Sequence, residues 1–130
     1  MLPPNRKKAK KGKEMLHDPR HDLPEWKRIL LRAHEIIEER GWCQQALQSA
    51  DGRVCLEAAI SIAACGSAVL EDDCEPSEGA ARAFAEMKLR AQFAPGEDHR
   101  LFVWNDRPGR TQDDVFKLIR ASVGELALVA

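Results

Sequence analysis

The chain has 130 residues, of which 44% are hydrophobic and 32% are charged, so its length and composition fit one domain with a single core. No apolar run approaches the ~20 residues of a transmembrane helix. No apolar stretch follows the N-terminal charges in the manner of a secretory signal. We therefore expect a cytoplasmic protein with no membrane contact.

The charges are divided unevenly along the chain, although the formal net charge is only −1. Residues 1–20 hold seven Lys or Arg against two acids, whereas the remaining residues hold 13 against 19. The basic stretch has too little apolar surface to offset its ordering entropy. We expect residues 1–22 to form a disordered basic arm and residues 23–130 to form a single mainly helical domain. The arm is either a solubilising tail or a non-specific contact for nucleic acid.

The first helix is predicted to begin at Asp22. This residue is a good N-cap, Glu25 can complete a capping box, and Pro24 is tolerated in the first turn. Apolar residues then recur every three or four positions, at Trp26, Ile29, Leu30, Ala33, Ile36 and Ile37. This spacing predicts an amphipathic helix of about 17 residues that ends at Gly41.

A hairpin and a buried helix are predicted next. The pair Asp51-Gly52 separates two short runs, which favours a small hairpin or bent loop. From Val54 or Cys55 to Cys65 nearly all residues are small and apolar. This composition predicts a central helix that packs in the core and ends at Gly66.

The next region begins with an acidic loop at residues 71–75, and Pro76 is suited to start a helix. This helix is predicted from about Ser77 to Gln92. Its expected apolar face consists of Ala80, Phe84, Met87 and Ala91, with Ala81 and Ala85 beside it. Both Trp26 and Phe84 are expected in the core.

The last region is predicted to run from strand to turn to helix. Residues 101–104 resemble a short strand, Pro108-Gly109 indicates a turn, and Thr111 can cap a final helix with Asp114 completing the box. That helix is predicted from Gln112 to about Ser122. The sequence therefore predicts a mainly α fold, a compact bundle of about four helices with a small hairpin or short strand-like segments.

No catalytic or metal-binding pattern is present. The cysteines Cys43, Cys55, Cys65 and Cys74 show no C-x-x-C spacing and have no suitably placed His. We expect reduced, mostly buried thiols and no metal. The chain also has no phosphate-binding Gly loop, no G-x-S-x-G and no H-E-x-x-H motif. We therefore expect no cofactor and no enzymatic activity.

The candidate site is a cluster of polar and aromatic residues just before the last helix. Trp104, Asn105, Asp106, Arg107 and Arg110 crowd beside a helix N-terminus, where free backbone N–H groups favour anions. The alternative is a structural turn, in which Asn105 and Asp106 bond their own backbone and Trp104 belongs to the core. The sequence leaves both interpretations open.

Three motifs resemble a family of short, uncharacterised bacterial and phage proteins. They are Gly41-Trp42-Cys43-Gln44, then Asp51-Gly52-Arg53-Val54-Cys55-Leu56, then Trp104-Asn105-Asp106 with Pro108-Gly109-Arg110-Thr111. The resemblance covers roughly residues 26–122 and departs at Gln45 and Ala58, which replace expected glycine-type positions. The layout is also similar to phage anti-Thoeris sponge proteins, which sequester cyclic ADP-ribose-type signalling nucleotides.

The sponge resemblance implies a non-catalytic protein that sequesters a small phosphorylated or cyclic ADP-ribose-type nucleotide. In that function Trp42 or Trp104 stacks on a ring, Asn105 bonds the polar edge, and Arg107 or Arg110 pairs with phosphate, with Asp106 beside them. The alternative is a protein- or nucleic-acid-interaction module that uses the basic arm. Self-association into a homo-oligomer is left open.

Overall fold

The computed structural model describes residues 22–67 and 77–124. Within these ranges the chain forms five α-helices: α2 (Glu25–Arg40), α3 (Leu56–Cys65), α4 (Glu78–Arg90), α5 (Leu101–Asn105) and α6 (Gln112–Val123). The fold is mainly α, as the sequence predicted. The basic arm up to residue 21, the acidic loop and Pro76 lie outside the described residues.

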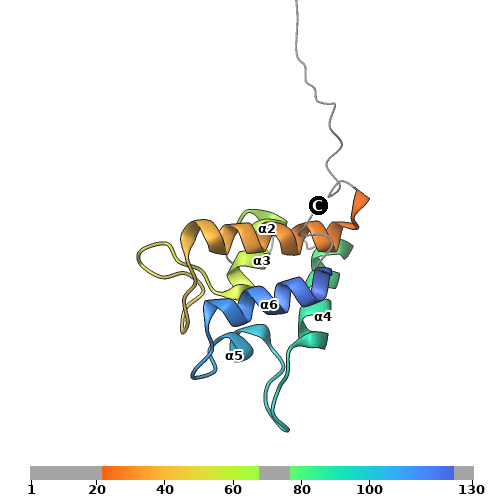
Figure 1. Cartoon of the computed structure of the whole chain (residues 1–130). Coiled ribbons are helices and arrows are strands. Elements are labelled where there is room, and N and C mark those ends of the chain that lie inside the picture. Colours follow the sequence, from red (N-terminus) through yellow and green to blue (C-terminus); the bar gives the residue numbers. More distant parts are fainter. Residues whose placement is uncertain (1–21, 68–76, 125–130) are drawn as a thin grey trace, which may run out of the picture.

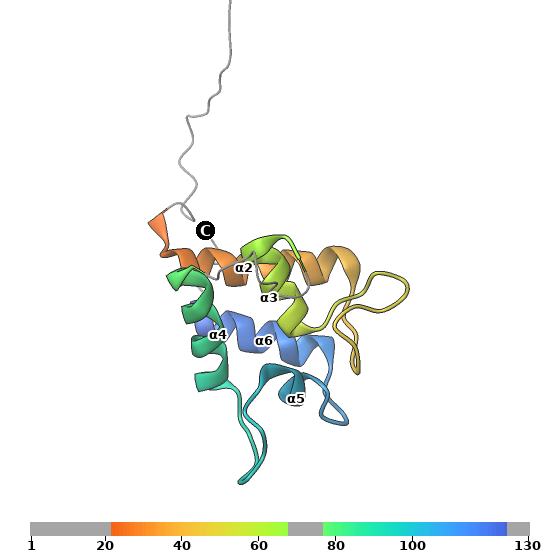
Figure 2. The ribbon, with the colours of Figure 1, turned by 180° about the vertical axis from the view of Figure 1, so that it is seen from behind.

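Helix α2 is the element around which the others pack. It contacts α3, α4 and α6, and in Figure 1 it lies across the top of the bundle with α6 below it. Figure 2 shows the opposite side, where α3 runs from α2 toward the short helix α5, which it also contacts. All six apolar positions predicted for α2 are buried, so the amphipathic pattern identified its inner face correctly.

Two predictions are corrected: the type of the element at residues 101–105 and the start of helix α2. Residues 101–105 form the short helix α5 and not a strand, because Leu101 and Trp104 are three residues apart and both enter the core from one helical face. Helix α2 begins at Glu25 with Pro24 as its N-cap and no side-chain cap bond, so the predicted Asp22 capping box is wrong. The short apolar run was ambiguous between helix and strand from its periodicity alone.

The predicted inner face of α4 is confirmed at Ala80, Met87 and Ala91 and differs at Phe84, where Ala83 is buried in its place. Ala80, Ala83 and Met87 are fully buried, while Phe84 only packs on the core as a partly buried side chain. Ala81 and Ala85, expected beside the inner face, are exposed. Phe84 therefore contributes less buried area than Trp26, which is confirmed as a core residue.

The predicted turn at Asp51-Gly52 is present in a small bridged loop. The Ser49 N–H donates to the Arg53 carbonyl at 2.8 Å, and Gly52 has a φ of +92°, which glycine adopts without steric cost. Val54 bridges Gln48 on one side and Trp42 on the other. The two motifs around residues 42 and 54 are thereby held together.

The thiol prediction is partly wrong. Cys65 is disulfide-bonded, whereas Cys43 and Cys55 are free and buried.

None of the described helices is long and apolar enough to span a bilayer.

Gln45 occupies a backbone conformation that suits glycine better. Its φ is +70°, and its side chain is exposed. A non-glycine residue in the left-handed region is strained by roughly 1–2 kcal/mol. Glycine removes this strain, but it also makes the unfolded chain more flexible, which offsets part of the stabilisation. Gln45→Gly is therefore expected to stabilise the fold by about 0.5–1 kcal/mol. Thermal melts test this, with Gln48→Gly as the control, since Gln48 has no positive φ. Equal destabilisation of both variants would contradict the expectation.

Candidate functional site

Asn105 ties together three parts of the chain that are distant in sequence. Its side chain is fully buried, and its Oδ1 atom accepts from the Trp42 indole Nε1 at 2.6 Å and from the Leu56 backbone N–H at 3.0 Å. Its Nδ2 atom donates to the Cys43 carbonyl at 3.1 Å and to Asp106 Oδ1 at 3.0 Å. Both polar atoms of the Asn105 amide are therefore engaged by the protein, which gives this residue a positioning role.

Gln44 holds the end of α5 and the turn that follows it. Its Nε2 atom donates to the Asn105 carbonyl at 3.0 Å and to the Arg107 carbonyl at 3.1 Å. The turn closes when the Arg110 N–H donates to the Arg107 carbonyl at 3.0 Å. Gly109, with a φ of +86°, sits after Pro108, as a type II turn requires.

The start of α6 is fixed by the predicted capping box. The Asp114 N–H donates to Thr111 Oγ1 at 3.1 Å, and the Thr111 N–H donates to Asp114 Oδ2 at 3.0 Å. Both bonds confirm the sequence prediction. Burial of Val115 and Ile119 in the core then sets the face that α6 presents to α2 and α4.

Arg110 lies flat against Trp104. The centre of its guanidinium is 3.8 Å from the Trp104 ring centroid, and its Nε atom donates to the Trp104 carbonyl at 3.0 Å. Its Nη2 atom is buried, yet it has no hydrogen-bond partner among the described residues. An unsatisfied buried guanidinium nitrogen is costly, so this atom requires an explanation.

A cavity of about 490 Å³ opens beside Arg110, between α4, α5 and α6. Four of its lining side chains are cationic and one is acidic. We call it the basic pocket and define it by Arg90, Trp104, Arg107, Arg110, Asp114 and Lys117.

Three of the four cations in the basic pocket have carboxylate partners that do not line it. Arg90 pairs with Glu86, Arg107 with Glu97 at 2.6 Å, and Lys117 with Asp113 at 3.2 Å. Arg110 has no carboxylate within salt-bridge distance among the described residues. Burial lowers the pKa of Arg110, and the neighbouring charge of Arg107 lowers it further. Arg110 is thus the one cation of the basic pocket without a carboxylate partner among the described residues.

The basic pocket brings together three of the six residues singled out from the sequence: Trp104, Arg107 and Arg110. Asp106 lines a different cavity, and Trp42 and Asn105 line neither of the two. The sequence reasoning missed Arg90 and Lys117, which lie on other helices. Their exposed helical positions gave no local signal, because only the packing of α4 against α6 brings them to one place.

The second cavity, of about 400 Å³, has Asp106, Glu57 and Phe102 in its lining, together with Cys55. Burial raises the pKa of the Cys55 thiol to about 11, so this thiol stays protonated at neutral pH. Within the described ranges, no three His, Cys, Asp or Glu side chains gather closely enough to hold a metal ion.

Comparison with known proteins places the chain in a family. The model of a family of unknown function, DUF6197, matches residues 21–124, and the chain belongs to that family. The match includes all five described helices and every residue that lines the basic pocket. No curated protein and no solved structure matches the chain.

Proposed function

We propose that this protein binds a small phosphorylated ligand in the basic pocket and holds it without chemical conversion. The observation that carries the proposal is Arg110, which lines the basic pocket and whose buried Nη2 atom has no partner among the described residues. A phosphate oxygen is a fitting partner, because guanidinium groups bind phosphate through charge-assisted hydrogen bonds.

The electrostatics of the basic pocket support an anionic ligand. Burial, the largest cause, and the charge of Arg107 lower the pKa of Arg110, whereas Asp114 and Glu97 raise it, so a bound anion would add to the negative charges that stabilise the guanidinium. Lys117, on α6, adds a second cation to the same lining and is paired with Asp113 outside it. The cavity volume of about 490 Å³ lies within the usual range for small-molecule sites.

The resemblance to the anti-Thoeris sponge proteins makes a cyclic ADP-ribose-type signalling nucleotide the first ligand to test. Such a nucleotide carries a diphosphate that Arg110 and Lys117 could pair with. In this proposal the protein acts as an anti-defence sponge, which sequesters the signal and so needs neither a cofactor nor a nucleophile. Trp42 and Asn105 do not line the basic pocket; the hydrogen bond between them helps to hold α5, which carries Trp104.

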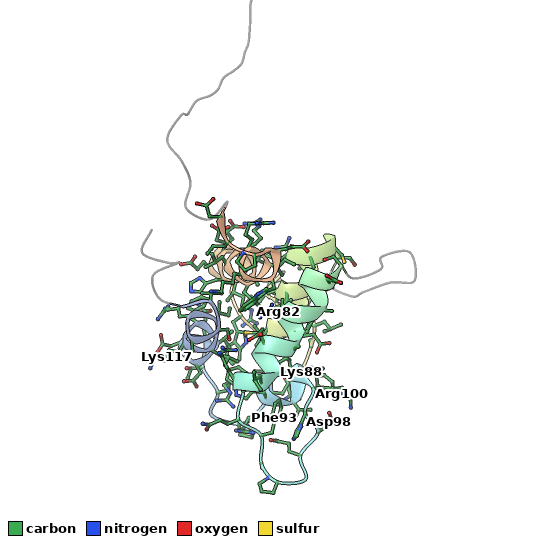
Figure 3. All side chains as sticks on the ribbon, turned by 90° about the vertical axis from the view of Figure 1, so that its right-hand side faces the viewer. Arg82, Lys88, Phe93, Asp98, Arg100 and Lys117 are labelled. Carbon is green, nitrogen blue, oxygen red and sulfur yellow. The ribbon has the colours of Figure 1, made fainter. Side chains whose placement is uncertain are left out.

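Isothermal titration calorimetry of the full chain with cyclic ADP-ribose and ADP-ribose tests the proposal. Saturable binding with a Kd below one millimolar is expected. Lys117→Ala should weaken it about three- to fivefold, since exposed charge pairs are worth up to about 1 kcal/mol. Lys88→Ala is the matched control: Lys88 is an exposed lysine on α4 that does not line the basic pocket, and Figure 3 shows it on a different helix from Lys117.

Lys88→Ala should bind like the wild type. The absence of binding at millimolar concentrations of both nucleotides would overturn the nucleotide proposal. Equal weakening by both lysine variants would show that net charge, and not the basic pocket, attracts the ligand.

A further inference from the structure

We infer that the basic pocket recognises the phosphate group of its ligand and leaves the nucleobase outside, so that binding does not depend on the base. This inference rests on the proposed function and makes it more specific. It starts from the position of Trp104, the aromatic residue of the basic pocket.

Trp104 has no ring face free for a base. Arg110 covers one face, with its guanidinium centre 3.8 Å from the ring centroid. The residue as a whole is only 5% exposed, and it belongs to the hydrophobic core. Stacking a nucleobase on Trp104 would require Arg110 to leave the ring and to break its Nε bond to the Trp104 carbonyl. The sequence expectation of a stacked ring therefore has no free surface at Trp104.

The guanidinium of Arg110 is held in one orientation by its contacts with Trp104. Its Nε atom is engaged by the Trp104 carbonyl, and its planar face is engaged by the indole. The Nη2 atom is the one that lacks a partner among the described residues. A guanidinium held in this orientation is preorganised, so an oxygen anion that reached its Nη2 atom would gain a hydrogen bond at little cost in side-chain entropy.

Only two side chains in the lining, Asp114 and Gln92, carry the carboxylate or amide groups that usually read a base edge. The carboxylate of Asp114 accepts from the Thr111 N–H in the capping box. Gln92 carries the one side-chain amide in the lining, and it belongs to an exposed residue. The remaining polar side chains of the basic pocket are cations, whose charge favours a phosphate group over an uncharged base.

A panel of small probes tests this inference by calorimetry on the full chain. The probes are inorganic pyrophosphate, ribose 5-phosphate, AMP, GMP, CMP and the uncharged nucleoside adenosine. The three nucleotides and ribose 5-phosphate are expected to bind within about threefold of one another, because they present the same phosphoryl group. Adenosine is expected not to bind at millimolar concentration. Comparing the affinity for pyrophosphate with that for ribose 5-phosphate shows whether the basic pocket prefers a diphosphate or a single terminal phosphate.

The outcomes separate this inference from the proposed function. Binding of adenosine, or a more than tenfold preference for one base over ribose 5-phosphate, would overturn the phosphate-only inference while leaving a nucleotide-binding protein. Failure of every phosphorylated probe to bind would overturn both. Base-independent binding of the phosphorylated probes, with no adenosine binding, would support both.

Discussion

Asn105→Ala is expected to cost at least about 3 kcal/mol of folding free energy, because it leaves several buried polar groups without partners at once. The Leu56 N–H and the Cys43 carbonyl would each lose a bond, and the Trp42 indole N–H would lose its acceptor. Leaving each such group unsatisfied costs roughly 1–3 kcal/mol. For a domain of this size the loss is a large share of total stability. Chemical denaturation monitored by circular dichroism measures it.

Gln112→Ala is the matched control for this prediction. Gln112 also carries a side-chain amide, but it is exposed at the first position of α6. Its substitution should change stability by less than about 0.5 kcal/mol. An Asn105→Ala protein that unfolds at the same denaturant concentration as Gln112→Ala would contradict the positioning role assigned to Asn105.

Arg110→Ala is expected to weaken binding of a phosphorylated ligand about ten- to a hundredfold. A charge-assisted hydrogen bond is worth roughly 1.5–3 kcal/mol, and about 1.4 kcal/mol corresponds to a tenfold change in affinity. The same change should also lower stability by about 1–2 kcal/mol, because Arg110 stacks on Trp104 and donates to its carbonyl. Binding is therefore measured by calorimetry at a temperature where melts show the variant to be folded.

Arg100→Ala is the matched control for Arg110→Ala. Arg100 also lies over an aromatic residue of α5, with its guanidinium centre 4.6 Å from the Phe102 ring centroid, but it does not line the basic pocket. In Figure 3, Arg100 and Lys117 lie on opposite sides of the view. Arg100→Ala should keep wild-type affinity. If both arginine variants bind equally weakly, the specific role of Arg110 is contradicted.

The sequence predicted those parts of the fold that depend on local patterns. The spacing of apolar residues located the inner face of α2, the pair Asp51-Gly52 located a turn, and Thr111 with Asp114 located the start of α6. Each of these signals lies within a few residues and has a direct physical cause. Residues 101–105 could not be assigned in this way, because five apolar and polar residues are too short to show a helical period.

For the candidate site, too, the sequence predicted what depends on neighbouring residues and missed what depends on contacts between distant ones. Crowding of Trp104, Arg107 and Arg110 within seven positions was visible in the sequence, and the structure places all three in the lining of the basic pocket. The engagement of Asn105 with Trp42, Cys43 and Leu56 was not predictable, because it depends on contacts across about 50 or 60 residues. The contribution of Arg90 and Lys117 depends likewise on how α4 and α6 pack.

The role of Arg110 is tested most directly by nuclear magnetic resonance of its own side chain. The Arg110 Nε–H group donates to the Trp104 carbonyl, so it is expected to exchange slowly enough to be observed. Titration of the wild-type protein with pyrophosphate should shift the Arg110 Nε–H resonance in a saturable way and leave that of Arg100 unchanged. An Arg110 resonance that stays in place up to millimolar pyrophosphate would contradict phosphate binding in the basic pocket.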